Sequence, residues 1–210
     1  MVKVVTSTLK SKYYKVGDAH IIETDPDNIY IKILGNTLNG VYGVNGTFYD
    51  TPRPTLPNSC WAIATNNGKA IGGNSMVNSY NKGIKRGTIV YYENGNIEIE
   101  RYNNINEYKS NHKWSIGGYS VYPKMYFKEE QISGGINYKT AHTYIGYKGK
   151  KIYLIAKPNH MIKDIIPLCK TLGLEGLIVL DGGGSSQLNH ISGRYTSTRK
   201  INSAIVLKEI

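Results

Sequence analysis

The stretch GLIVLDGGGSSQL, residues 176–188, places a carboxylate and a run of small residues directly after an apolar segment. Residues 176–180 predict a short buried strand, because they are apolar, rich in β-branched side chains and bounded by Gly. Asp181 stands where that strand ends. The residues that follow it are Gly182, Gly183, Gly184, Ser185 and Ser186. Because glycine lets the backbone turn sharply and approach a ligand closely, the stretch favours an anion-binding site, with a plain tight turn as the alternative.

The hydrophobic period changes just before this stretch. In residues 159–173 the apolar side chains recur at helical spacing, and Gly173 is a suitable C-cap. This segment therefore predicts a helix, in which Pro167 either introduces a kink or starts a second turn.

The rest of the chain predicts β-structure. The sequence holds 23 Gly and 18 Tyr but only 2 Phe, which indicates many strands and turns. Pairs such as Asn94-Gly95 are favoured hairpin turns. The predicted strands and hairpins are 19–25, 28–35, 40–50, 60–73, 87–102, 113–123, 140–158 and 199–210. We therefore predict one α+β domain over residues 1–210, with a mixed, largely antiparallel β-sheet and one main helix before the DGGGSS loop.

The charge balance favours an anionic partner. A formal net charge of +11 suits nucleic acid, an anionic wall polymer, a phosphorylated sugar or a nucleotide. The lysines are scattered, and no nucleic-acid-binding motif is present. The first 18 residues lack the apolar core of a signal peptide, and no segment approaches the roughly 20 apolar residues of a membrane span. These features predict a cytoplasmic protein without a membrane partner, with a phage-encoded or released form as the alternative.

The two cysteines and the acidic residues give no metal motif. Cys60 and Cys169 are too far apart for a ligand pair, so we predict buried free thiols. No His or Cys cluster has ligand spacing, and no cofactor is predicted. The remaining option is a divalent cation that Asp50 and Asp181 would share with phosphate oxygens.

The order of these pieces resembles the phosphodiester glycosidase family over about residues 40–207. The quoted motifs are VNGTFYD (44–50), SIGGYSVYP (115–123), TAHTYIGYKGKKIYLIAK (140–157), the predicted helix, GLIVLDGGGSSQL and RKINSAIVL (199–207). The resemblance implies a hydrolase that cleaves a sugar-1-phosphodiester between the anomeric carbon and the phosphate oxygen.

The resemblance implies roles for the residues around the glycine stretch. Asp181 would act as general acid/base or nucleophile near the anomeric carbon, unless it only caps the turn. The glycines and serines from Gly182 to Ser186 would hold the phosphate. Arg199 matches the family's arginine before the last strand, and its guanidinium would bind two phosphate oxygens at once.

The VNGTFYD motif supplies a second group of candidates. Asn45 would bind a sugar hydroxyl or the phosphate, and Gly46 would permit close approach, although the pair also suits an ordinary turn. Asp50 is a second carboxylate, and Asp50 and Asp181 would form the acid/base pair of a glycosidase.

Two positions depart from the family pattern. His142-Thr143 stands where the family commonly carries Arg-Thr. His142 would bind phosphate or act as a catalytic acid/base, with Thr143 in substrate binding. The segment AKPNH, 156–160, stands where the family tends to carry Asp-Gly. These departures are also compatible with changed specificity or lost activity.

Two other functions remain open from the sequence. One is a non-catalytic binding module that keeps the phosphate cradle and sequesters an anionic, phosphate-containing ligand such as a nucleotide. The other is a basic nucleic-acid-binding protein, whose binding would depend steeply on salt.

Overall fold

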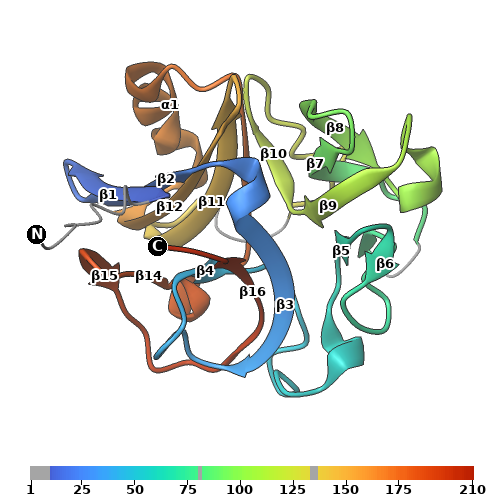
Figure 1. Cartoon of the computed structure of the whole chain (residues 1–210), viewed down its shortest axis with the longest axis horizontal. Helices are drawn as coiled ribbons and strands as arrows, with labels where there is room; N and C mark the ends of the chain where they lie inside the picture. The colour runs from blue at the N-terminus through green and yellow to red at the C-terminus, as the bar shows by residue number, and fades with distance from the viewer. Residues whose placement is uncertain (1–9, 80–81, 133–136) are drawn as a thin grey trace, which may run out of the picture.

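The computed structural model describes residues 10–79, 82–132 and 137–210, which form three β-sheets, a short α-helix and several 3-10 turns (Figure 1). The first sheet has the order β1 (Ser11–Val16), β2 (Ala19–Thr24), β12 (Lys151–His160), β11 (Thr140–Lys148), β13 (Gly176–Val179) and β10 (Tyr119–Tyr122). The second has the order β15 (Gly193–Tyr195), β14 (Leu188–His190), β4 (Gly43–Asn45), β16 (Ile201–Leu207) and β3 (Ile29–Asn36). The third has the order β6 (Lys69–Ala70), β5 (Ala64–Asn66), β9 (His112–Gly117), β7 (Arg86–Tyr92) and β8 (Ile97–Tyr102).

The strand pairings confirm the predicted α+β class with largely antiparallel strands. Every pairing within the described sheets is antiparallel, and the longest is the hairpin of β11 and β12. The hairpin of β7 and β8 turns where Asn94-Gly95 predicts, and Gly95 has a φ of +86°. Local turn chemistry therefore locates these hairpins correctly.

The predicted helix lies directly before the glycine stretch. A 3-10 turn, η5 (Ile162–Ile165), leads into α1 (Ile166–Leu172), and Gly173 closes the helix in the left-handed region with a φ of +67°. Pro167 lies in the first turn of α1, where its missing N–H removes no intrahelical bond. It therefore starts the helix and does not kink it.

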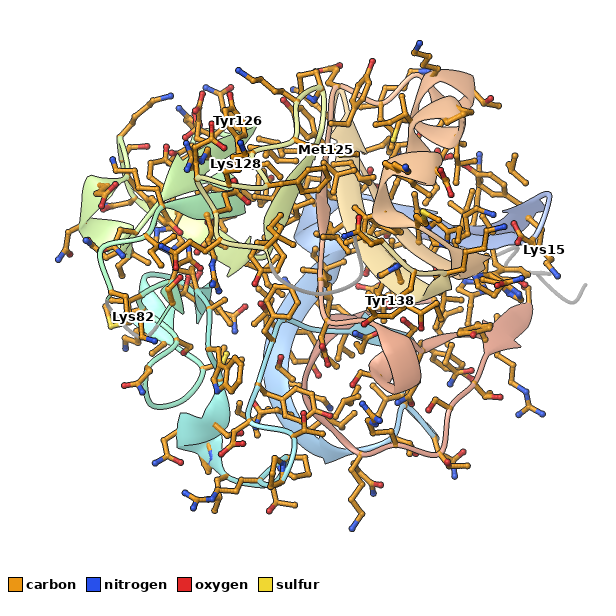
Figure 2. All side chains as sticks on the ribbon, turned by 180° about the vertical axis from the view of Figure 1, so that it is seen from behind. Lys15, Lys82, Met125, Tyr126, Lys128 and Tyr138 are labelled. Carbon is orange, nitrogen blue, oxygen red and sulfur yellow. The ribbon has the colours of Figure 1, made fainter. Side chains whose placement is uncertain are left out.

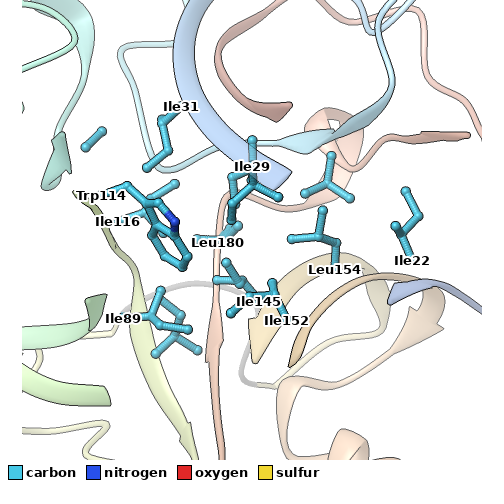
Figure 3. Close-up of a cluster of buried hydrophobic side chains, with 14 of the residues drawn as sticks. Ile22, Ile29, Ile31, Ile89, Trp114, Ile116, Ile145, Ile152, Leu154 and Leu180 are labelled. Carbon is cyan, nitrogen blue, oxygen red and sulfur yellow. The ribbon is translucent and has the colours of Figure 1, made fainter. Parts of the chain in front are cut away.

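An apolar centre joins the three sheets. Figure 3 shows Ile22 and Leu154 of the first sheet, Ile31 of the second and Trp114 of the third converging on it. A second cluster fills the space between the first sheet and α1. Cys60 lies in the first cluster and Cys169 in the second, and both are buried free thiols, as predicted. Burial of this apolar surface is the main force that holds the sheets together.

Several neighbours in sequence belong to different sheets. The strands predicted at 19–25 and 28–35 are β2 and β3, which lie in the first and second sheets. The segment 113–123 divides at Gly117-Gly118 into β9 of the third sheet and β10 of the first. Gly118 allows the chain to pass close to β13, because a Cβ there would lie 2.2 Å from the carbonyl oxygen of Val179.

The ends of the described chain meet beside the second sheet. The Lys10 N–H donates to the Ile210 carbonyl over 3.3 Å, and the Lys10 Nζ lies 2.7 Å from the Glu209 carboxylate. Asn28 joins this contact by donating from Nδ2 to the Glu209 carbonyl over 2.8 Å. Within the described part of the chain, no helix is long and apolar enough to cross a membrane.

Candidate functional site

The glycine loop, residues 181–186, begins where the chain leaves the first sheet. All four residues of β13 are buried, and the Leu180 N–H donates to the Thr143 carbonyl over 2.8 Å. The next amide, that of Asp181, donates to the Gly46 carbonyl over 3.3 Å. Asp181 therefore stands at the junction between the first sheet and the segment that follows β4.

The three glycines of the loop serve different purposes. Gly183 has a φ of +60°, a conformation that other residues rarely adopt. A Cβ on Gly182 would lie 3.0 Å from Nδ1 of His142, and a Cβ on Gly184 would lie 2.8 Å from Cζ of Arg199. Two of the glycines thus allow the imidazole and the guanidinium to pack directly on the backbone of the loop.

A cleft of about 430 Å³ lies against this loop. It is lined by Phe48, Tyr119, Tyr138, Thr140, His142, Ile162, Val179, Leu180, Asp181, Gly182, Gly183, Gly184 and Arg199. Figure 2, which views the molecule from the side opposite to Figure 1, shows Tyr138 close to the short 3-10 turn η6 (Gly183–Ser185) of the loop. The structure therefore brings six sequence candidates, Asp181, His142, Arg199 and the three glycines, to one cleft.

Asp181 is the acidic side chain of this cleft. Burial raises the pKa of its carboxyl to about 6, although the Ser185 hydroxyl, the Gly182 N–H and the Arg199 charge favour the ionised form. A carboxyl that titrates near neutral pH can exchange a proton during a reaction.

His142 lies on the wall next to Asp181 and is almost wholly buried. Burial lowers the pKa of His142 to about 4, and the nearby His160 adds to this effect, so the imidazole is neutral at pH 7. The two rings meet edge to face at 5.1 Å, and Nε2 of His160 is 2.7 Å from the Tyr144 hydroxyl. The Nε2 atom of His142 has no hydrogen-bond partner among the described residues. His142 therefore offers a neutral hydrogen-bonding group and no positive charge.

Arg199 supplies the positive charge of the cleft. It lies on residues 196–200, which we call the strap, between β15 and β16. The Ser197 hydroxyl ties the strap to the loop by donating to the Gly184 carbonyl, and Gln187 Nε2 donates to the Arg199 carbonyl over 2.8 Å. Gly183 and Gly184 line the cleft beside this charge, and their backbone N–H groups are uncharged hydrogen-bond donors. Such a group of donors around one cation is suited to an oxyanion.

Asn45 and Thr143 lie behind the loop and do not line the cleft. The Asn45 Oδ1 accepts from the Thr143 hydroxyl over 2.6 Å and from the Gln187 N–H over 2.9 Å. Its Nδ2 donates to the Asp181 carbonyl over 2.8 Å. Because the amide is fully engaged and 1% exposed, it fixes the position of Asp181 and has no free group for a ligand.

Three smaller candidates also lie outside the cleft lining. A Cβ on Gly46 would lie 2.3 Å from the Ser203 hydroxyl, so this glycine allows a close approach to β16 and not to a ligand. The Ser185 hydroxyl contacts the Tyr49 hydroxyl at 3.3 Å, and the Ser186 hydroxyl is buried without a partner among the described residues.

Asp50 is not brought to Asp181. Its carboxylate lies 3.8 Å from the Arg53 guanidinium, and it is absent from the lining of the cleft. The expected pairing of Asp50 with Asp181, as acid and base or around a shared cation, therefore has no support in this arrangement. Across residues 10–79, 82–132 and 137–210, no cluster of three His, Cys, Asp or Glu side chains is placed to hold a metal ion.

An aromatic wall faces the glycine loop, and sequence reasoning did not identify it. The rings of Phe48 and Tyr119 meet at 4.7 Å, and the Arg86 guanidinium packs 4.8 Å from the centre of the Tyr119 ring. Tyr138 completes the wall and is 59% exposed. Phe48 and Tyr119 lie within the motifs VNGTFYD and SIGGYSVYP. Membership of these two motifs is the sequence signal by which the two aromatic residues could have been identified.

Known proteins share this fold. Residues 39–208 match the family model described as phosphodiester glycosidase. The catalytic domain of zebrafish N-acetylglucosamine-1-phosphodiester alpha-N-acetylglucosaminidase, auto-inhibited by its pro-peptide, is similar with a TM-score of 0.69 at 15% identity, over 99% of this chain and 85% of that chain. A hypothetical protein from Synechocystis has a TM-score of 0.61 at 9% identity, over 93% of this chain and 61% of that chain. Among curated proteins, no sequence matches the chain.

Proposed function

Because the chain belongs to the phosphodiester glycosidase family, we propose that it hydrolyses a sugar-1-phosphodiester at the bond between the anomeric carbon and the phosphate oxygen. One observation carries this proposal: Asp181, with its raised pKa, lines the same cleft as Arg199 and the glycine loop. The cleft therefore offers a proton-exchanging group and an anion-binding group to one ligand.

The anion-binding end of the cleft holds the phosphate. Arg199 donates two parallel hydrogen bonds to its oxygens, and the backbone N–H groups of Gly183 and Gly184, which line the cleft, add uncharged donors. At the other end, the aromatic wall of Phe48, Tyr119 and Tyr138 packs on the sugar face.

The leaving group explains why one carboxylate is sufficient. When the bond between the anomeric carbon and oxygen breaks, the electron pair stays on the phosphate, which departs as a monoester whose second pKa is about 6. This group leaves without protonation, and Arg199 stabilises its growing charge. Ionised Asp181 then takes a proton from the water that attacks the anomeric carbon, or attacks that carbon itself before water releases the sugar.

The position of bond cleavage tests the proposal. The protein is incubated with a sugar-1-phosphodiester in water labelled with heavy oxygen, and both products are analysed by mass spectrometry. Attack at the anomeric carbon places the label in the sugar and leaves the phosphomonoester unlabelled. Label in the phosphate would mean attack at phosphorus and would overturn the proposal.

The same experiment distinguishes the binding-module alternative. Tight binding of the diester with no turnover across the pH range would favour sequestration of an anionic ligand.

Arg199→Lys keeps the charge but loses the bidentate geometry, so it lowers kcat/KM by about tenfold, equivalent to about 1.4 kcal/mol.

A further inference from the structure

A second hollow lies on the other side of the strap. Its volume is about 410 Å³, and Ser197 lines it while also binding the Gly184 carbonyl of the glycine loop. Its lining consists of Thr37, Leu38, Asn39, Gln187, Leu188, Asn189, Arg194, Tyr195, Thr196, Ser197 and Thr198. The strap contributes to both cavities, because residues 196–198 line the hollow and Arg199 lines the cleft.

The charges of the second hollow favour an anion. Arg194 is its charged side chain, no carboxylate lines it, and no described residue forms an ion pair or side-chain hydrogen bond with Arg194. A third hollow of about 430 Å³ continues past Asn189 and Arg194 and also has no carboxylate in its lining. Two other hollows on the protein do have a carboxylate in their lining, which is Asp27 in one and Glu93 in the other.

The uncharged groups of the second hollow are suited to sugar units. The hydroxyls of Thr196 and Thr198 and the amide of Asn39 line it, and such groups hydrogen-bond sugar hydroxyls. Its aromatic residue, Tyr195, packs against His20 at 5.6 Å. The hollow therefore offers a single, partly buried ring, whereas sites for single-stranded nucleic acid use several aromatic side chains on which successive bases stack.

We propose that the second hollow is an accessory subsite for a further phosphate of the substrate, so that the protein acts on a repeating sugar phosphodiester. This inference rests on the proposed function in one respect, namely that the phosphate next to the cleaved bond binds at Arg199. Arg194 and Arg199 are five positions apart, which is at most about 18 Å of extended chain. Two linked phosphates that occupy both subsites bind more tightly than one, because the second contact is intramolecular.

Binding by an inactive variant tests the subsite without turnover. Asp181→Asn protein is titrated with hexose-1-phosphodiesters of one, two and four repeating units. We expect the four-unit ligand to bind about tenfold more tightly than the single unit. In the Asp181→Asn/Arg194→Glu protein, this ratio falls to about one, because the added carboxylate repels the second phosphate.

Lys69→Glu in the same background is the matched control. Lys69 lies exposed on β6, and the variant changes the net charge by the same amount. We expect it to keep the length preference, and unfolding temperatures of all variants report on the fold. An equal loss in the Lys69→Glu protein, equal affinity for all lengths, or no binding of any length would overturn the inference.

Two further arms separate the possible causes of failure. If the parent protein cleaves the single unit but shows no length preference, the accessory subsite is wrong and the proposed function stands. If nothing is cleaved but the length preference depends on Arg194, the subsite stands and the proposed function is wrong. If a single-stranded oligonucleotide with four phosphates binds more tightly than the four-unit sugar phosphodiester, the hollow is a nucleic-acid site, and the proposal of a sugar-phosphate substrate is wrong.

Discussion

The glycine loop at 181–186 and the segment 45–50 carry similar groups, yet they have different tasks in the structure. Each has a carboxylate, glycine and a hydroxyl residue. The loop presents Asp181 to a cleft, whereas Asp50 lies beside Arg53 away from it, and Asn45 is buried behind the loop. Residue type alone therefore does not define the site, because burial and hydrogen bonding decide which group remains free for a ligand.

Replacing the carboxylate of the loop should have the largest effect on activity of all changes in these two regions. Asp181→Asn should lower kcat/KM by about a thousandfold, because a neutral amide cannot accept the proton or attack the anomeric carbon. Steady-state hydrolysis of a sugar-1-phosphodiester measures this effect. Retention of more than a tenth of the activity would remove Asp181 from its proposed role.

The same variant should be more stable at pH 7. The folded pKa of Asp181 is about 6, above its ordinary 3.8, so the folded state holds the proton more tightly, and stability is lost as the pH rises through this range. An amide cannot ionise, so Asp181→Asn should gain roughly 2 kcal/mol at pH 7 and little at pH 3.5. Denaturant unfolding at both pH values checks this difference.

Removing the buried amide of the other segment should damage the fold itself. Asn45→Ala leaves the Thr143 hydroxyl, the Gln187 N–H and the Asp181 carbonyl without their partner. We expect a loss of about 3 kcal/mol in the free energy of unfolding. Asn106→Ala, at an exposed position whose side chain makes no such bonds, should change it by less than about 0.5 kcal/mol. Equal effects of the two variants would break the contrast.

The pH profile tests which form of Asp181 is active. Because the proposed mechanism uses the ionised carboxylate, kcat/KM should fall about tenfold per pH unit below about 6 and be flat above it. His142, whose pKa is about 4, contributes no titration between pH 5 and 8. A rate that falls above pH 6 would instead make Asp181 the general acid.

Replacing the carboxylate of the segment 45–50 should have the smallest effect. Asp50→Asn removes a partly exposed group whose one ion pair among the described residues is with the exposed side chain of Arg53, at 3.8 Å. Activity should stay within about twofold and stability within about 0.5 kcal/mol of the parent. A larger loss of activity would restore Asp50 as a candidate partner of Asp181.

Local signals in the sequence predict much of the fold. The apolar run before Asp181, the C-cap at Gly173 and the turn at Asn94-Gly95 each act over a few residues, and the structure has β13, α1 and the hairpin of β7 and β8 at these places. The strands β14 and β15 were not predicted, because each has only three residues and no alternating pattern.

Features that depend on distant partners could not be predicted. The contacts of Asn45 join positions about 100 to 140 residues apart along the chain, so nothing near Asn45 in sequence indicates that its amide is occupied. The division of the chain among three sheets has the same origin, as at Gly118, whose close neighbour is the carbonyl of Val179. Family resemblance located the segments of the site, and geometry was needed to separate groups that line the cleft from groups that support it.

The meeting of Lys10 with Ile210 has a practical consequence for engineering. Because these residues are already hydrogen-bonded, a short glycine-rich linker could join them without strain, and new termini could be opened at the exposed turn of Asn94-Gly95. Such a circular permutant would keep the described strand pairings and place the opened turn on the third sheet, none of whose strands lines the cleft. A fluorescent reporter or an immobilisation tag attached there would leave the cleft uncovered.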